Sequence, residues 1–239
     1  MNITIRKSAE RGQADHGWLQ AKHSFSFANY YDPKHMHFGP LRVLNEDIIQ
    51  AGEGFGLHSH HNAEIISYVL SGGLKHEDSM ANGGILRPGD VQYMSAGSGI
   101  THSEFNSSKA EPVHIFQIWI LPNEKNTEPR YLQRHFDRED RDGKWQLLAS
   151  ANGRGESFSI RQDVDLYAAL IEAGKSLNYQ LPQGRKAWLQ LASGELRLNG
   201  RLLQAGDSAA IKGSGELNIA ANQDAELLFF DFVDLVRTA

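Results

Sequence analysis

The sequence contains no cysteine. Disulfide bonds, thiolate catalysis and zinc sites built from cysteine are therefore excluded. A metal ion bound to this chain would have to be held by histidine and carboxylate side chains, which are the strong ligands that remain. Such ligand sets favour a catalytic or exchangeable metal site over a closed structural one.

Long apolar runs and an excess of basic charge are also missing. No apolar segment approaches the roughly 20 residues that a transmembrane helix needs, and the first residues contain no apolar signal core. The formal net charge is -5, and the basic residues usually stand beside acidic ones, as in residues 138–142. These features predict a cytoplasmic protein that binds neither membranes nor, directly, nucleic acid.

Helical periodicity is nearly absent, and the apolar residues occur in short runs that are typical of strands. These runs are rich in β-branched and aromatic residues and cover residues 41–49, 65–70, 91–94 and 113–121. Glycine, proline, asparagine and aspartate separate them. Short strands with turns between them favour an all-β sandwich or barrel. A single helix is predicted, around residues 163–171.

Short glycine motifs recur in the same order in the two halves of the chain. The matching pairs are Ala51-Gly52 with Ala173-Gly174, Ser71-Gly72 with Ser193-Gly194, Gly89-Asp90 with Gly206-Asp207, and Gly97-Ser98-Gly99 with Gly213-Ser214-Gly215. Each half then ends in an apolar strand. The repeat predicts two antiparallel β-barrels, at residues 1–134 and 135–239, joined through the charged stretch 123–144.

The histidines are unevenly distributed, because all 11 of them precede Phe136. His58 and His60 are two residues apart, so on a strand both side chains point to the same face. His102 and Glu104 repeat this spacing further along the chain. Two such strands inside one barrel would present three imidazoles and a carboxylate to a single transition-metal ion.

The second half of the chain tests this prediction, because a duplicate that lost the site should lack all of its ligands. At the offsets of the repeat, His58 corresponds to Gln180, His60 to Pro182, His102 to Asn218 and Glu104 to Ala220. These replacements cannot provide three imidazoles and a carboxylate. The second barrel is therefore predicted to be structural and to contain no metal.

The sequence around the predicted ligands resembles the two cupin motifs. The first motif contains Gly52, His58-Ser59-His60, Glu64 and Gly72, and the second contains Gly89, Gly97, His102 and Asn106. Longer segments are similar to the pirin family of bicupins, among them residues 25–33, 41–45, 76–79 and 94–104. This resemblance is close over residues 1–122 and looser over the rest of the chain.

The pirin resemblance implies a bicupin with one iron ion in its N-terminal barrel, bound by three histidines and a glutamate. Carried over residue by residue, these ligands are His58, His60, His102 and Glu104. Iron(II) is the expected ion, with manganese, nickel, cobalt, copper and zinc as alternatives. One departure is Ser59, which stands where pirins usually have a proline between the two histidines.

A second glutamate competes with Glu104 for the role of fourth ligand. Other cupins use the glutamate of the first motif, which is Glu64 here, and this residue has the same strand parity as His58. The pirin resemblance assigns the role to Glu104, and we favour that assignment. Glu64 is then expected to orient an imidazole from outside the ligand set. His76 has no partner at ligand spacing and is predicted to be a structural histidine.

The resemblance also implies an enzyme. Some bacterial pirins oxidise the flavonol quercetin, so a quercetin 2,3-dioxygenase-like enzyme is expected, which opens the central ring of an aromatic substrate with dioxygen. Glu104 would serve as a ligand and also as general base for the substrate's hydroxyl. The alternative is a metal-dependent regulator that binds a protein partner and turns nothing over, as eukaryotic pirins do.

Overall fold

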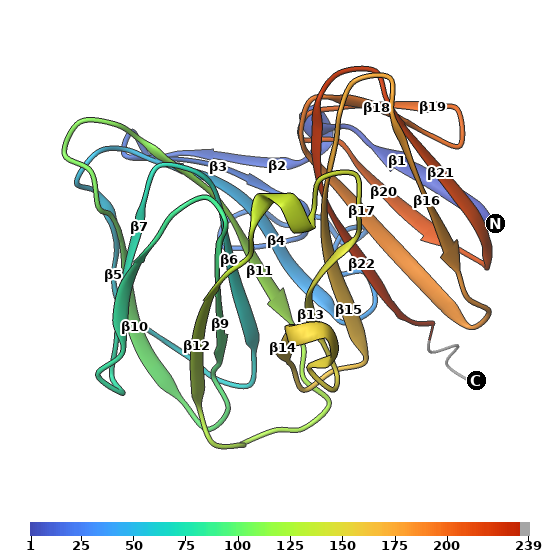
Figure 1. Ribbon diagram of the computed structural model, residues 1–239. Coiled ribbons are helices and arrows are strands. Elements are labelled where there is room, and N and C mark those ends of the chain that lie inside the picture. The colour runs from blue at the N-terminus through green and yellow to red at the C-terminus, as the bar shows by residue number, and fades with distance from the viewer. Residues whose placement is uncertain (235–239) are drawn as a thin grey trace. The chain divides into compact units, whose positions relative to one another are not determined.

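The computed structural model describes residues 1–234, and the regular secondary structure of this part of the chain is almost entirely β-strand (Figure 1). It divides into two compact units. The N-terminal unit is Arg11–Phe136, and the C-terminal unit combines Met1–Glu10 with the chain from Asp137 onward. The helical elements of the described residues are three short 3-10 turns, η1 (Ser8–Glu10), η2 (Arg138–Asp140) and η3 (Arg154–Glu156). None of the helices within residues 1–234 could span a membrane.

The N-terminal unit consists of a seven-stranded and a four-stranded antiparallel sheet. In spatial order, the larger sheet contains β12 (Arg130–His135), β9 (Asp90–Ser95), β6 (Glu64–Ser71), β11 (Val113–Ile120), β4 (Leu41–Ile49), β3 (Leu19–His23) and β2 (Gly12–Asp15). The smaller sheet contains β5 (Gly54–His60), β10 (Ile100–Asn106), β7 (Leu74–Asp78) and β8 (Gly83–Leu86). Buried apolar residues from both sheets form one cluster, so the sheets pack face to face.

The C-terminal unit also consists of a seven-stranded and a four-stranded sheet. Its larger sheet contains, in order, β1 (Asn2–Arg6), β20 (Ser208–Lys212), β17 (Arg185–Ser193), β22 (Ala225–Val233), β15 (Val164–Ile171), β13 (Gln146–Ser150) and β14 (Phe158–Ser159). Its smaller sheet contains β16 (Ser176–Leu181), β21 (Gly215–Ala221), β18 (Glu195–Leu198) and β19 (Arg201–Gln204).

The two units repeat one topology, as the glycine motifs predicted. The order β5-β10-β7-β8 in one small sheet is matched by β16-β21-β18-β19 in the other. The all-β, cupin-type architecture expected from the sequence is thus present in duplicate. The closed barrels are not: within residues 1–234 every sheet has a linear strand order with two free edges. Each unit is therefore a pair of packed open sheets.

The first strand of the chain belongs to the C-terminal unit, which differs from the predicted division at residues 134 and 135. β1 pairs with β20, with Asn2 opposite Lys212 and Arg6 opposite Ser208. In the N-terminal unit the matching edge position beside β9 is filled by β12, which follows the last strand of that repeat. Both units need an edge strand at this position, and the C-terminal one takes it from the start of the chain.

The helix predicted around residues 163–171 is wrong, because this segment forms β15. The sequence Val-Asp-Leu-Tyr-Ala-Ala-Leu-Ile contains good helix formers, but the strand is hydrogen-bonded on both sides, to β13 and to β22. Buried residues alternate with partly exposed ones in its first half and are continuous in the second. Tertiary pairing therefore overrides the local helical preference.

Alternation along the strands places histidine and other polar side chains of the N-terminal unit in its interior. On β10 the buried positions are Ile100, His102, Glu104 and Asn106, and the residues between them are more exposed. The same period of two makes Leu74 and His76 buried on β7. Polar side chains thus occupy positions that an ordinary sandwich would fill with apolar ones.

Strand pairing corrects the repeat offsets used for the ligand positions. Asn218 pairs with Asn178, and both are exposed. His102 lies opposite His58 and Glu104 opposite His76, whereas the interior pairs of the C-terminal unit are Leu217 with Tyr179 and Ile219 with Leu198. The inward-facing equivalents are therefore Tyr179 for His58, Leu181 for His60, Leu217 for His102 and Ile219 for Glu104. A slip of one residue moves a side chain to the other face, so the residues at the repeat offsets are not the equivalents of the histidines and Glu104.

Candidate metal centre

Three histidines converge between β5 and β10. His58 and His60 are on β5, and His102 lies directly opposite His58 in the antiparallel pair. The ring centroids are 4.3 Å apart for His58 and His102, 4.8 Å for His58 and His60, and 4.9 Å for His60 and His102. Their potential ligand nitrogens all lie within 4.8 Å of one another. This spacing fits a single metal ion bound by three imidazoles.

Glu104 lies beside this cluster and is completely desolvated. It follows His102 on β10, after an irregularity in the pairing with β5. Gln117 Nε2 donates to Glu104 Oε2 at 2.5 Å and Ser67 Oγ donates to Oε1 at 3.1 Å. Its carboxylate forms a second group of potential ligands with His76 and His102, again within 4.8 Å. The structure thus joins Glu104 to His102 but does not group it with His58 and His60.

The hydrogen bonds leave Nε2 of His58 and Nε2 of His102 available to bind a metal. His58 Nδ1 is 2.8 Å from the carbonyl oxygen of Gly56, to which it donates, so its Nε2 is available. His102 Nε2 is buried and has no hydrogen-bond partner among residues 1–234. A buried polar atom without a partner is costly and calls for an ion or a water. The donor set therefore fits a transition metal.

Burial keeps the imidazoles of His60 and His102 neutral. Desolvation, reinforced by neighbouring histidines, lowers the pKa of His60 to about 4 and that of His102 to about 2. Neutral imidazole is the form that binds metals, so little proton release is needed from these residues. Burial raises the pKa of Glu104 to about 7, despite its hydrogen bonds from Ser67 and Gln117. Asp47, which faces Glu104, has its pKa raised by burial and by that carboxylate.

Glu64, the competing fourth ligand, is engaged elsewhere. It is buried on β6, and its two carboxylate oxygens accept hydrogen bonds from the hydroxyls of Tyr93 and Ser95. Neither group of potential metal ligands among the described residues includes it. These two hydroxyls hold the buried carboxylate of Glu64 away from the histidine cluster.

His76 is a member of the site that sequence reasoning missed. It is fully buried on β7, where its Nδ1 lies 3.3 Å from Nδ1 of His102. Its Nε2 lies 3.4 Å from Asp78 Oδ2, and Tyr131 stacks on its ring at 4.8 Å. Asp78 is itself held by Asn82. The signal that could have found His76 is its parity with Leu74, which places it on the inner face of β7.

A cavity of about 250 Å³ adjoins the three histidines. Its apolar walls are Phe27, Phe55, Ile65 and Trp119, and its polar lining includes Asn45, Asp47 and Gln117. Trp119 makes an edge contact with His60, with centroids 4.7 Å apart. A small organic molecule in this cavity would lie against the histidines in a largely apolar environment.

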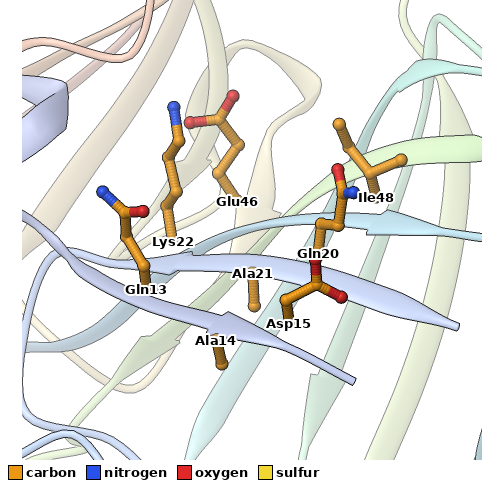
Figure 2. Close-up of a pocket in the computed structure, with 8 residues that line it drawn as sticks. All are labelled: Gln13, Ala14, Asp15, Gln20, Ala21, Lys22, Glu46 and Ile48. Atoms are coloured by element: carbon orange, nitrogen blue, oxygen red, sulfur yellow. The ribbon is translucent and has the colours of Figure 1, made fainter. Parts of the chain in front are cut away.

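A second hollow, on the outer face of β2, β3 and β4, has a different character. Figure 2 shows Gln13, Lys22 and Glu46 extending from one side of these strands, and Ala14 and Ala21 from the other. Burial opposes ionisation of Glu46, but its contacts with His114 and Arg11 outweigh this and lower its pKa to about 2. Arg11, Glu46 and His114 thus form a largely buried ion-pair network, and neither group of potential metal ligands within residues 1–234 includes them.

Known proteins match both units of the chain. The family model described as Pirin matches residues 4–120, and the one described as Quercetinase C-terminal cupin domain matches residues 147–232. A protein of Escherichia coli (strain K12) named quercetin 2,3-dioxygenase is 46% identical over 230 residues, which is 96% of this chain and 98% of that protein. A pirin-like protein of Caulobacter vibrioides is 44% identical over 221 residues, or 92% of this chain and 95% of that protein.

A solved structure is also similar to the whole chain. The crystal structure of the bacterial pirin YhhW from Escherichia coli, in complex with nickel(II), has a TM-score of 0.93 and 42% sequence identity to this chain. The alignment covers 98% of this chain and 100% of that one. The likeness therefore extends over both units.

Proposed function

The chain belongs to the pirin family, and from this premise we propose that it is a metal-dependent dioxygenase that opens the ring of a flavonol such as quercetin. The observation that carries the proposal is the cluster of His58, His60 and His102 at an aromatic-walled cavity in the N-terminal unit. Relatives named for this activity support it. The cellular location we propose is the cytoplasm.

The proposed ligands of one divalent transition metal are His58, His60, His102 and Glu104. Iron(II) is our first choice, because three imidazoles and one carboxylate leave positions open, as in iron(II) oxygenases. When bound, the ion supplies a Lewis acid that can hold a deprotonated hydroxyl next to dioxygen. The C-terminal unit has apolar or aromatic residues at the equivalent inward positions, so one ion per chain is expected.

The chain's own residues would prepare the substrate. Burial raises the pKa of the metal-free Glu104 carboxylate to about 7, and in the loaded site this carboxylate would accept the proton of a substrate hydroxyl as general base. Gln117 and Ser67 fix the direction of that carboxylate through their hydrogen bonds. Phe27, Phe55 and the other apolar walls exclude water and position an aromatic ring.

His76 and Asp78 are proposed as positioning residues. If His102 binds the metal through Nε2, its Nδ1 carries the proton and faces Nδ1 of His76. His76 must then accept at Nδ1 and donate from Nε2, on the side where Asp78 lies. The arrangement defines a single tautomer for each ring. Hydrogen bonds from outside the ligand set orient metal-binding histidines in this way.

An aerobic assay with quercetin tests the function. The chain is loaded with iron(II), manganese(II) or nickel(II), and the loss of flavonol absorbance is followed together with carbon monoxide release. Metal-dependent turnover by the wild-type chain that disappears in His102→Ala is the expected result. No metal-dependent loss of absorbance with any of these ions would remove the enzymatic proposal and leave the regulator that binds a protein partner.

A further inference from the structure

The cavity beside the histidines is small for a polycyclic substrate. Its volume is about 250 Å³, whereas pockets that enclose drug-sized ligands typically measure roughly 300–1,000 Å³. A single substituted aromatic ring fits this space, but a molecule of three rings needs more room. The remainder of such a substrate must lie outside the metal cavity.

A second cavity, of about 470 Å³, adjoins the first. The two cavities have Phe27 and Phe55 in common, so these rings stand at their boundary. The outer cavity is lined from β2, β3, the turn between them and the loop after β3 by residues that include Trp18, His23 and Tyr30. All of them belong to the N-terminal unit.

Aromatic contacts connect the outer cavity with the candidate ligands along one wall. Trp18 meets Phe55 edge to face, with centroids 5.3 Å apart. Phe55 in turn contacts His58 at 6.3 Å. This wall therefore runs from the outer cavity to a candidate ligand without a break in ring-to-ring contact.

A second row of rings is built in the same way. Tyr30 stacks with His23 at 6.4 Å, and His23 contacts Phe27 at 5.5 Å. Phe27 meets Trp119 edge to face at 5.5 Å, and Trp119 meets His60 at 4.7 Å. Two rows of rings thus line one path, and flat aromatic ligands gain from such surroundings through stacking and edge contacts.

We propose that this outer cavity binds the distal ring of a polycyclic aromatic substrate whose reacting ring lies at the histidines. The inference rests on the proposed function, because it takes the histidine cluster as the reacting end. His16 and Asn29 also line the outer cavity and provide polar groups for hydroxyls on the distal ring. The chain would accordingly prefer linked-ring phenols over single-ring catechols.

Ala14 offers a way to close the outer cavity without removing an aromatic wall. It lines this cavity from β2 and projects from the opposite side of the strand to Gln13 (Figure 2). In Ala14→Phe the new ring would occupy the space of the distal ring and leave the metal cavity unchanged. Trp18→Leu is a second variant, which removes part of one wall. Tyr31→Ala is the matched control, because Tyr31 is 74% exposed and lines neither cavity.

The experiment measures binding without turnover. The nickel(II)-loaded full chain is titrated calorimetrically in the absence of oxygen with quercetin, as the three-ring probe, and with catechol, as the one-ring probe. Ala14→Phe and Trp18→Leu should weaken quercetin binding by about tenfold or more and leave catechol binding within about twofold of wild type. Tyr31→Ala should change neither, and metal content should equal that of wild type in all three variants.

The outcomes separate this inference from the proposed function. Equal losses for both probes, no loss for either, or no quercetin binding by the wild-type chain would overturn the outer subsite. Failure to oxidise quercetin in air, with the selective loss of binding intact, would overturn the dioxygenase and leave the subsite in place.

Discussion

Removal of the His76 imidazole tests whether His76 orients the candidate metal ligand His102. In His76→Ala the acceptor facing His102 Nδ1 is lost, and so is the link from His102 to Asp78. Loss of such an outer partner typically weakens metal binding by about 10–100-fold, or about 1.4–2.7 kcal/mol. Both separations, 3.3 Å and 3.4 Å, are long for hydrogen bonds. We therefore expect a loss nearer to tenfold, with the ion still bound stoichiometrically at saturation.

The assay is chelator competition with cobalt(II) as the probe, because its visible absorption also reports coordination number. The spectrum of His76→Ala should keep the intensity of wild type, whereas a lost ligand would change it. His135→Ala is the control: its ring is exposed, is hydrogen-bonded to Asp90 and lies outside the site. Unchanged affinity would refute the positioning role. Complete loss of the ion, as in a ligand variant, would instead make His76 a ligand through its group with His102 and Glu104.

Three further predictions concern ligands and charge. His58→Ala should abolish stoichiometric metal binding, measured by elemental analysis of the purified chain, whereas wild type and Gln180→Ala should each contain one ion per chain. Two ions per wild-type chain would contradict the prediction of a single site. Glu104→Gln should weaken metal binding, whereas Glu64→Gln should lower the melting temperature and keep the ion; the reverse pattern would make Glu64 the ligand. The pKa of Glu46 is depressed to about 2, so its contribution to stability is present above about pH 4.5 and is lost as the pH falls toward 2. Glu46→Gln should therefore cost about 3 kcal/mol of unfolding free energy at neutral pH and progressively less in acid, as denaturant titrations would show; a cost independent of pH would refute the ion-pair account.

The histidine cluster was predictable from the sequence because the spacing of residues within each strand indicates which side chains share a face. His58 and His60 on one strand, and His102 on another, follow the period of two that fixes which side chains share a face. The pirin resemblance joins the two strands into one site. The position of Glu104, beside His76 rather than grouped with all three histidines, needed the structure.

What could not be predicted depends on pairing between distant strands. β1 joins the C-terminal unit through β20, and nothing in its five residues identifies that partner. The segment at β15 has helix formers and becomes a strand because both of its edges are paired. His76 has no ligand spacing within its own strand, and it reaches His102 only across the sheet.

The C-terminal unit shows how the same frame can exist without the histidines. The places of His102 and Glu104 are taken by Leu217 and Ile219, which join an apolar core with Leu181. At the place of His58, Tyr179 donates a hydrogen bond to Asp231 at 2.6 Å. The same topology thus accommodates either an apolar or a polar interior. His102 Nε2 lacks one among residues 1–234, so the polar interior of the N-terminal unit costs stability that a bound ion would restore.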